Sequence, residues 1–371
     1  MKKIFVFLGL VSALVLGASC SKELTGGVDG GELVAGAGET LLTVRFDSPA
    51  TKVASQTATN EKAIRNVQVF IFRAGSGADA GMLETAKSAG FDVPLEVTTG
   101  TYSGLQLKSS TGTREVWAVI NDSQDRTSGA NAVQTKTEFL AQVHDLENST
   151  SSKLLMVGHS NPEGTTPAIQ FTEGAMPVTV PVHRLAASVV LESVTNSFDS
   201  PGYQKSDIFR VEACYLINVP GRINFGETSE PSSLDDAYWY AKMAAETSAS
   251  RMALTYDSMS NSIVNYGSAY TTKHTFYNYP NNCAQSVDAS WSKRGTLLVV
   301  EASIKYATGW QLFYYPIKLD QNLESNKQYH VNLTIHRPGS LDPNKPVTFA
   351  EVTPTITVSN WETGSAYNPE I

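Results

Sequence analysis

The sequence has few of the residues from which catalytic and metal centres are built. Its 371 residues include three cysteines and six histidines, and only 17% of them are charged. The closest histidine pair, His330 and His336, has no third ligand at a recognised spacing, so no metal site is predicted. The glycines of 75–81 lack the Lys-Ser/Thr ending of a phosphate-binding loop, and no Gly-x-Ser-x-Gly motif occurs. We therefore expect a protein that is not an enzyme and has no cofactor.

Long apolar runs and positive charge are also scarce. Beyond the first twenty residues, no stretch approaches the roughly 20 apolar residues of a membrane helix. The formal net charge is −8, which gives no reason to expect nucleic-acid binding.

The first twenty residues have the pattern of a secretory signal. Lys2 and Lys3 precede an apolar run over 4–16, and the segment ends in Gly17-Ala18-Ser19-Cys20. This ending resembles a bacterial lipobox, although glycine stands where leucine is usual. The interpretation is a signal peptide over 1–19 and a lipid-modified (palmitoylated) Cys20, which gives an outer-membrane lipoprotein precursor. The alternative is an ordinary signal peptide with an incidental cysteine.

The rest of the chain has an all-β pattern. A glycine-rich stretch over 20–39 predicts a flexible tether, and short runs of period two or of β-branched and aromatic residues follow it. Seven strands are expected on each side of residue 184, which predicts β-sandwich domains over 40–184 and 185–371. The expected strands are 41–46, 67–72, 102–107, 115–121, 154–158, 168–171 and 178–183, then 189–194, 210–219, 274–279, 297–306, 311–318, 329–336 and 352–361.

Two stretches and two cysteines need separate interpretation. Amphipathic helices are expected over 135–146 and 233–244. Cys214 lies in an apolar strand pattern, so a buried hydrophobic role is favoured over pairing with Cys283, which stays possible in an oxidising compartment.

Several of the expected strands carry marker residues, which follow one another in a definite order along the chain. They are Trp117 to Asn121, Arg184 to Leu191, Tyr215 to Val219, Phe276 to Asn281, Tyr314 to Ile317, Tyr329 to Ile335, Gly339-Ser340 and Val358 to Trp361. In this order they resemble the strands of the type V fimbrillins, the major fimbrial subunit (FimA-like) family. The resemblance covers nearly all of the chain after the signal.

The resemblance implies a fold and a mode of assembly. Members of the family have two transthyretin-like β-sandwich domains in tandem and are exported as lipoproteins. An Arg/Lys-specific surface protease removes the first strand, and subunits then polymerise by donor-strand exchange. The expected partners are copies of the same chain, accessory fimbrial subunits, that protease, and host or bacterial surface ligands in adhesion and biofilm formation.

The residues that would carry this assembly lie near the two ends of the chain. Leu42, Val44 and Phe46 alternate with polar residues, as the displaced strand with one buried face should. Lys52 follows a turn-like Ser-Pro-Ala-Thr stretch and is the expected cleavage site, ahead of Lys62 and Arg65.

The donor strand is expected near the C-terminus. Val352, Ile356 and Val358 share one face, and Pro354 suits an edge strand. The alternative is that 353–361 closes its own domain and only 362–371 is free to act as donor.

Two other functions remain open at this stage. One is a tip or accessory adhesin that binds through the loops 195–205 or 284–294. The other is a surface glycan-binding lipoprotein that uses Trp239, Trp291 or Trp310, although core packing is favoured for these. Asp257-Ser258-Met259 also resembles an O-glycosylation sequon, which three residues specify weakly.

Overall fold

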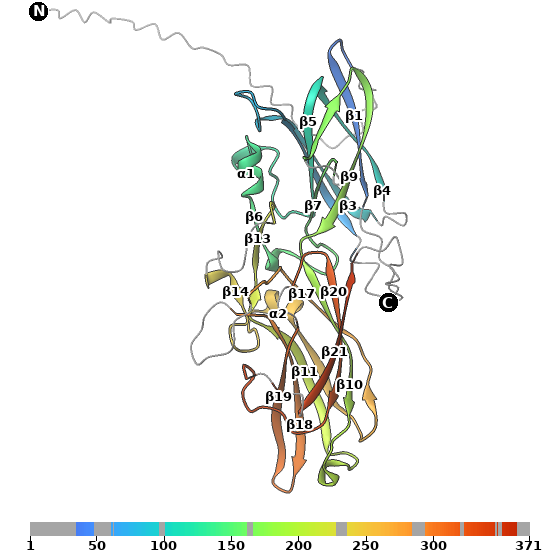
Figure 1. Ribbon diagram of the computed structural model, residues 1–371, viewed down its shortest axis with the longest axis vertical. Helices are drawn as coiled ribbons and strands as arrows, with labels where there is room; N and C mark the ends of the chain where they lie inside the picture. Colours follow the sequence, from blue (N-terminus) through green and yellow to red (C-terminus); the bar gives the residue numbers. More distant parts are fainter. Residues whose placement is uncertain are drawn as a thin grey trace, which may run out of the picture. The chain divides into compact units, whose positions relative to one another are not determined.

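The computed structural model describes residues 35–47, 61, 63–95, 101–161, 166–227, 236–283, 294–319, 323–345, 347 and 351–361 (Figure 1). The side chains of 45–47, 91–95, 101–104 and 236 are outside this description. All described residues belong to one compact unit, which begins at Ala35. Strands dominate it, so the all-β prediction is confirmed.

Residues before Arg184 build one sheet in the upper part of Figure 1. Its strands are bonded in the order β3-β2-β5-β7-β9-β1-β4, and β8 also pairs with β5. The bounds are β1 Glu39–Asp47, β2 Ile64–Arg73, β3 Leu83–Leu95, β4 Thr101–Ser110, β5 Gly112–Ile120, β7 Met156–His159, β8 Ala168–Phe171 and β9 Gly174–Arg184.

The period-two pattern of these strands produces a core on one face of the sheet. Every second residue of β2 (Val67, Val69, Ile71) packs with every second residue of β5 (Val116, Ala118, Ile120). β1, β4 and β9 add Leu42, Val44, Leu105, Leu107, Val178, Val180 and Val182 to the same cluster. On the other face, Phe70 and Phe72 pack against Phe139 of helix α1 (Lys136–Leu140). The middle strands are therefore buried on both faces.

Residues after Arg184 build two further sheets in the lower part of Figure 1. One has the order β16-β10-β20-β21 with β17 paired to β10, and the other has the order β15-β11-β18-β19. The bounds are β10 Ala187–Asn196, β11 Phe209–Ile217, β15 Tyr256–Ile263, β16 Ala269–Tyr270, β17 His274–Asn278, β18 Leu297–Tyr306, β19 Gly309–Lys318, β20 Lys327–Ile335 and β21 Val352–Asn360. Apolar residues of both sheets, such as Val331 and Val300, share one core.

Short elements connect the upper and lower sheets. β6 (Val143–Asp145) pairs with β13 (Arg222–Asn224), and β12 (Val219–Pro220) pairs with β14 (Trp239–Tyr240). The division into two domains at residue 184 stays a prediction, since the larger apolar cluster contains residues from both sides of it.

The predicted strands are found within a few residues of their expected bounds, whereas one predicted helix is found only in part and the other is wrong in its described part. Of 135–146, only Lys136–Leu140 is α-helical, and Val143–Asp145 forms β6. In the described part of 233–244, a 3-10 turn (Asp236–Tyr238) leads into β14. The longer helix is α2 (Ala249–Thr255), which the sequence did not signal. Strands β3 and β15 were also not predicted.

Within the described part of the chain, no helix combines the length and the apolar character needed to cross a membrane.

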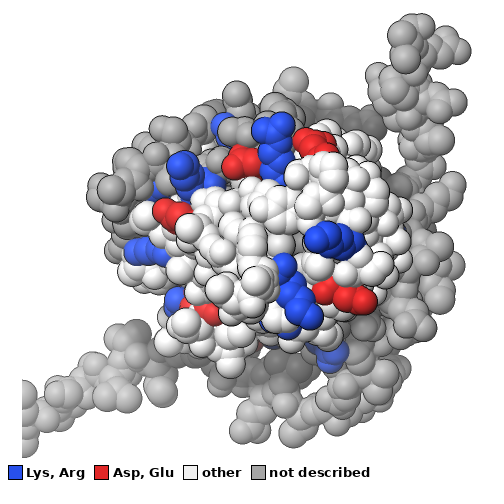
Figure 2. Space-filling view, turned by 90° about the horizontal axis from the view of Figure 1, so that it is seen from below, with Lys and Arg blue, Asp and Glu red and all other residues white. Residues whose placement is uncertain are grey.

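Figure 2 shows the lower end of the structure, which contains the β18–β19 turn. Acidic and basic side chains are interspersed among uncharged ones on the described part of this face. On that part of the face they form no extended patch of one sign.

Candidate functional site

Strand β1 lies inside its sheet, next to the edge strand β4. It pairs antiparallel with β4, where Leu42 faces Leu107, and parallel with β9, where Leu42 faces Met176. The β4 register shifts between Val44 and Arg45, and pairing continues to Asp47 on both sides. Both rows of β1 backbone groups are therefore used in ladders.

The side chains of β1 reinforce this position. Leu42 and Val44 are 0% exposed, whereas Leu41 and Thr43 are half-buried. Thr40 is also buried, and its hydroxyl donates to the carbonyl of Thr172 across 2.6 Å. Phe46 pairs through its backbone with Tyr102 and Val180, and its side chain is outside the description. Two of the three predicted displaced-strand residues thus have a structural position that suits that role.

Removal of β1 would have a large local consequence. β4 and β9 would each lose a ladder of about eight residues, and the pockets of Leu42 and Val44 would open between them. Unpaired backbone groups and vacant apolar pockets are a template for another strand. The region between β4 and β9, here called the β1 groove, is a strand-binding site that the chain's own β1 fills.

The predicted donor residues lie in β21, at the edge of a sheet. β21 pairs antiparallel with β20, where Ile356 faces Val331 and Pro354 faces Leu333. Along its inner face, exposure rises from 1% at Val352 through half-buried Ile356 to 46% at Val358. The strand occupies its own sheet here, with an apolar face that becomes less covered toward Asn360.

Trp361 closes β21 in a buried polar cluster. Its indole N–H donates to Glu61 Oε2 across 3.1 Å, and the Tyr277 hydroxyl donates to Glu61 Oε1 across 2.6 Å. Arg184 donates to the Glu61 carbonyl across 3.1 Å and lies 4.7 Å above the Trp361 ring. All four residues are nearly or fully buried. Burial and the adjacent Glu61 carboxylate raise the pKa of Tyr277, so its hydroxyl stays a donor.

Comparison with known proteins finds a match over a segment that contains most of β1. A family model described as major fimbrial subunit protein (FimA) matches residues 41–183, the segment that contains the β1 groove. Over this segment the chain is similar to the FimA fimbrial family. The match to a structural subunit favours the expectation that the chain is not an enzyme. No curated protein matches the sequence.

Solved structures extend the likeness of fold to both halves of the chain. A structure described as a cell adhesion protein from Parabacteroides distasonis has a TM-score of 0.59 at 16% identity, covering 89% of this chain and 100% of its own. Another so described, from Bacteroides eggerthii, has a TM-score of 0.59 at 21% identity, with 87% and 96% covered. A fimbrilin from Porphyromonas gingivalis has a TM-score of 0.58 at 15% identity, with 88% and 99% covered.

Of the residues predicted for lipid attachment and cleavage, the structure describes only some. Cys20, Lys52 and Lys62 lie outside the described residues. Arg65 lies within β2, where its backbone N–H donates to Asn121 and its guanidinium donates to Ser152 Oγ and the Ser152 carbonyl, each across 3.2 Å. Cleavage after Arg65 would require strand β2 to open.

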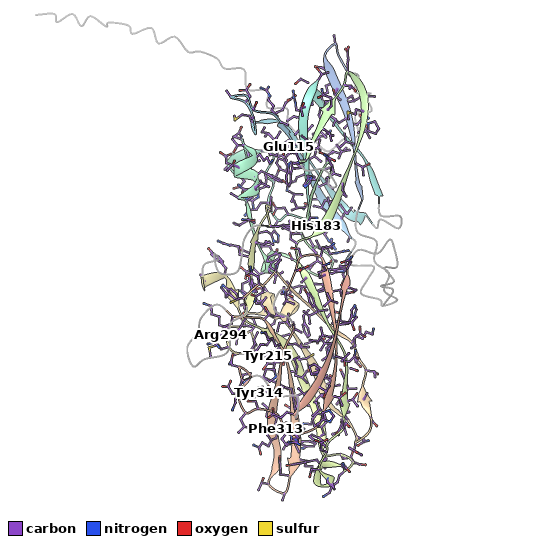
Figure 3. The ribbon with its side chains drawn as sticks, in the orientation of Figure 1. Glu115, His183, Tyr215, Arg294, Phe313 and Tyr314 are labelled. Atoms are coloured by element: carbon purple, nitrogen blue, oxygen red, sulfur yellow. The ribbon has the colours of Figure 1, made fainter. Side chains whose placement is uncertain are left out.

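The histidines that were considered as metal ligands make local contacts with carboxylates. His330 Nδ1 lies 2.7 Å from Glu192 Oε1, and His336 Nδ1 lies 3.5 Å from Asp199 Oδ1. His183, labelled in Figure 3, lies 2.5 Å from Glu227 Oε1 at the end of β9. Among the described residues, no three His, Cys, Asp or Glu side chains gather as metal ligands would.

The remaining candidate residues of the chain are mostly structural. Cys214 and Cys283 are not disulfide-bonded, and Cys214 is fully buried, as the favoured interpretation predicted. Trp239 is buried, and Trp310 lies 4.4 Å from the Arg210 guanidinium. Trp291 is outside the described residues.

Ser258, from the sequon-like triplet, is exposed on edge strand β15. The strand bulges there, since Ser262 pairs with Val211 while Ser258 pairs with Ala213.

Sequence reasoning missed the Glu61 cluster because its members are far apart in the chain. A lone glutamate beside Lys62 is indistinguishable from a surface charge in the sequence. The nearest signal in the sequence is Arg184, which stands before an apolar strand and is one of the family's marker residues.

Proposed function

We propose that this chain is a fimbrillin, a stalk subunit that polymerises by donor-strand exchange. Release of β1 opens the β1 groove, and a strand near the C-terminus of a second copy fills it. The observation that carries the proposal is that β1, the first described strand, is an interior strand with ladders on both sides. Its loss therefore creates an acceptor site for backbone and side chains together.

The donor in this proposal is the segment that carries Val352, Ile356 and Val358. Its partly covered apolar face offers side chains for the pockets of Leu42 and Val44. Ten or so paired residues contribute about 0.5 to 1.5 kcal/mol for each hydrogen bond and about 1.5 to 3 kcal/mol for each fully buried aliphatic side chain. Such sums overestimate affinity, yet they support very slow dissociation.

Cleavage after Lys52 releases β1 in this proposal. Cleavage after Lys62 or Arg65 would also remove Glu61, which would leave Tyr277 and Trp361 without their acceptor in a buried site. A buried donor without a partner costs about 1 to 3 kcal/mol. Lys52 precedes Glu61 in the chain, so cleavage there leaves the cluster intact.

Export precedes this step. The chain is proposed to reach the outer membrane as a lipoprotein held by acylated Cys20, and an Arg/Lys-specific protease then frees it into a surface fimbrium. Accessory fimbrial subunits would join it there, and the assembled fimbrium would support adhesion and biofilm formation.

Mass spectrometry of the two forms tests both processing steps. The precursor should yield an acylated peptide that begins at Cys20, and the assembled form should begin at Val53. A Lys52→Ala variant should stay at precursor size and fail to polymerise. Wild-type processing and polymerisation of Lys52→Ala would show that the assigned site is wrong.

A further inference from the structure

Strand β4 is weakly held compared with the other wall of the β1 groove. Its ladder partner among the described residues is β1, whereas β9 also pairs with β7 over Val182–Arg184. Yet β4 is not attached through β1 alone, because side chains of β3 reach it from the opposite edge of the sheet.

Glu84 of β3 makes the main contact with β4. Its Oε1 accepts from the Ser110 backbone N–H across 2.6 Å, from the Ser110 hydroxyl across 2.7 Å and from the Ser109 hydroxyl across 2.8 Å. Its Oε2 faces Arg114 Nε of β5 across 2.5 Å and Arg73 Nε of β2 across 3.6 Å. Both carboxylate oxygens are thus engaged.

The environment of this carboxylate is shielded and favours its charge. The Glu84 side chain is 11% exposed, and Ser109 is buried. Burial raises the pKa of Glu84, but the hydrogen bonds from Ser110 and Ser109 and the charge of Arg114 outweigh it and hold the pKa below its ordinary value. Hydrogen bonds to a charged group in such a setting are stronger than neutral ones.

None of these partners belongs to β1. Arg114 also donates to the Ser110 hydroxyl across 2.6 Å, and Lys87 of β3 donates to the Gln106 carbonyl of β4 across 3.1 Å. By contrast, the ion pair between Lys108 and Glu39, at 3.3 Å, joins β4 to β1 and disappears when β1 leaves. The contacts of Glu84 would survive that step.

We propose that Glu84 is a positioning residue that holds β4 in place after β1 is released and so keeps the β1 groove open for the incoming strand. This inference rests on the proposed strand exchange. Without Glu84, only the bonds from Arg114 and Lys87 hold β4 away from β9, to which it runs antiparallel. Leu105 and Leu107 can then bury against Val178 and Val180. That collapse would satisfy the exposed groups and remove the acceptor site.

Full-length wild type, Glu84→Ala and Glu84→Gln provide the test. Each is treated with a lysine-specific protease, and N-terminal sequencing checks that all are cut at the same residue. The processed monomers are then titrated with a fluorescent peptide of residues 39–47, and polymer is followed by electron microscopy. Asp79→Asn is the matched control, because it removes an exposed ion pair with Arg73 that has no contact with β4.

The uncleaved Glu84 variants should keep the wild-type circular dichroism spectrum, because β1 still holds β4. After cleavage, the peptide should bind Glu84→Ala at least about tenfold more weakly than wild type, with a matching loss of polymer. Asp79→Asn should behave as wild type. Wild-type peptide affinity in processed Glu84→Ala would overturn the positioning role alone. A processed wild type that neither binds the peptide nor polymerises would overturn strand exchange itself, and the role of Glu84 with it.

Discussion

Two buried asparagines fix the ends of central strands. Asn121 follows β5 with φ 65°, and Asn218 follows β11 with φ 57°, both in the left-handed region that asparagine tolerates. Asn121 accepts from the Arg65 N–H across 2.8 Å and donates to the carbonyls of Ala63 and Leu154 across 2.8 and 3.0 Å. Asn218 accepts from the Met243 N–H across 3.0 Å. Each side chain ties its strand to segments distant in sequence.

Substitutions of Asn121 should separate the contribution of its hydrogen bonds to stability from that of its positive φ. Asn121→Ala loses three hydrogen bonds and strains a positive φ, so we expect a loss of about 3 to 5 kcal/mol in unfolding free energy. Asn121→Gly removes the same bonds without the strain and should cost about 1 kcal/mol less than alanine. Urea denaturation followed by fluorescence measures both. Equal losses would show that the backbone conformation contributes nothing.

His144 should make the protein less stable at acid pH. Burial lowers the pKa of His144 to about 4, more than the carboxylates of Asp122 and Asp145 raise it, and its Nδ1 lies 2.7 Å from the Tyr279 hydroxyl. Below the unfolded pKa of about 6.5, the unfolded chain therefore binds a proton that the folded chain excludes. Stability is lost as pH falls from there to about 4.

The His144→Gln variant is a direct control for the pH dependence of the unfolding free energy. Between pH 7 and pH 5, His144 alone should cost about 2 kcal/mol of unfolding free energy. His144→Gln can still bond to Tyr279 but does not titrate, so its stability should fall less over that range. Identical slopes for wild type and His144→Gln in denaturant titrations would contradict this assignment.

At the scale of elements, β21 allows a sharp test of the donor role. Val358 is 46% exposed and Thr357 is exposed on the opposite face, so neither Val358→Asp nor Thr357→Asp should unfold the monomer. Val358→Asp places a charge where an apolar pocket of the next subunit is proposed, which should block polymerisation. Thr357→Asp should polymerise as wild type.

Ile356→Asp is the stronger form of the same test. Ile356 is half-buried and packs against the core, so this variant also reports whether β21 belongs to its own sheet. If it loses its thermal transition while Val358→Asp still polymerises, the donor must be sought in 362–371. Electron microscopy and thermal melting distinguish the two cases.

The strands could be predicted from sequence because their signal is local. Alternation in 41–46 and dense apolar content in 67–72 were enough to find β1 and β2. Strand β3 carries Lys87, Ser88 and Gly90 between its apolar residues and gave no such signal. The 135–146 helix was overpredicted because Val143 and Leu146 continue the helical spacing, while in the structure β6 pairs with β13.

The candidate site was predictable in its residues but not in its arrangement. Leu42 and Val44 could be assigned to a buried strand face, yet that β1 lies between β4 and β9 follows from pairings across up to about 140 residues of sequence. The contacts of Glu61 with Trp361 and of Glu84 with Ser110 likewise depend on the completed fold. A single charged residue has no periodic pattern from which such contacts could be predicted.

For the whole molecule, the proposed polymerisation requires β1 to leave the sheet. Leu42 and Leu107 are directly paired across β1 and β4, and paired residues of antiparallel strands have Cα atoms about 4.5 to 5.5 Å apart, within the range of a disulfide. A Leu42→Cys/Leu107→Cys variant would therefore lock β1 to β4. Val69→Cys/Ala118→Cys is the control, because it joins β2 to β5, which the proposal leaves in place.

The decisive measurement is polymer formation by the locked variant after protease treatment, with and without reductant. If β1 must leave its groove, the oxidised Leu42→Cys/Leu107→Cys protein is cut but stays monomeric, and reduction restores polymerisation. The Val69→Cys/Ala118→Cys control should polymerise in both states. Wild-type polymer yield from the oxidised Leu42→Cys/Leu107→Cys protein would contradict the claim that β1 must leave its groove.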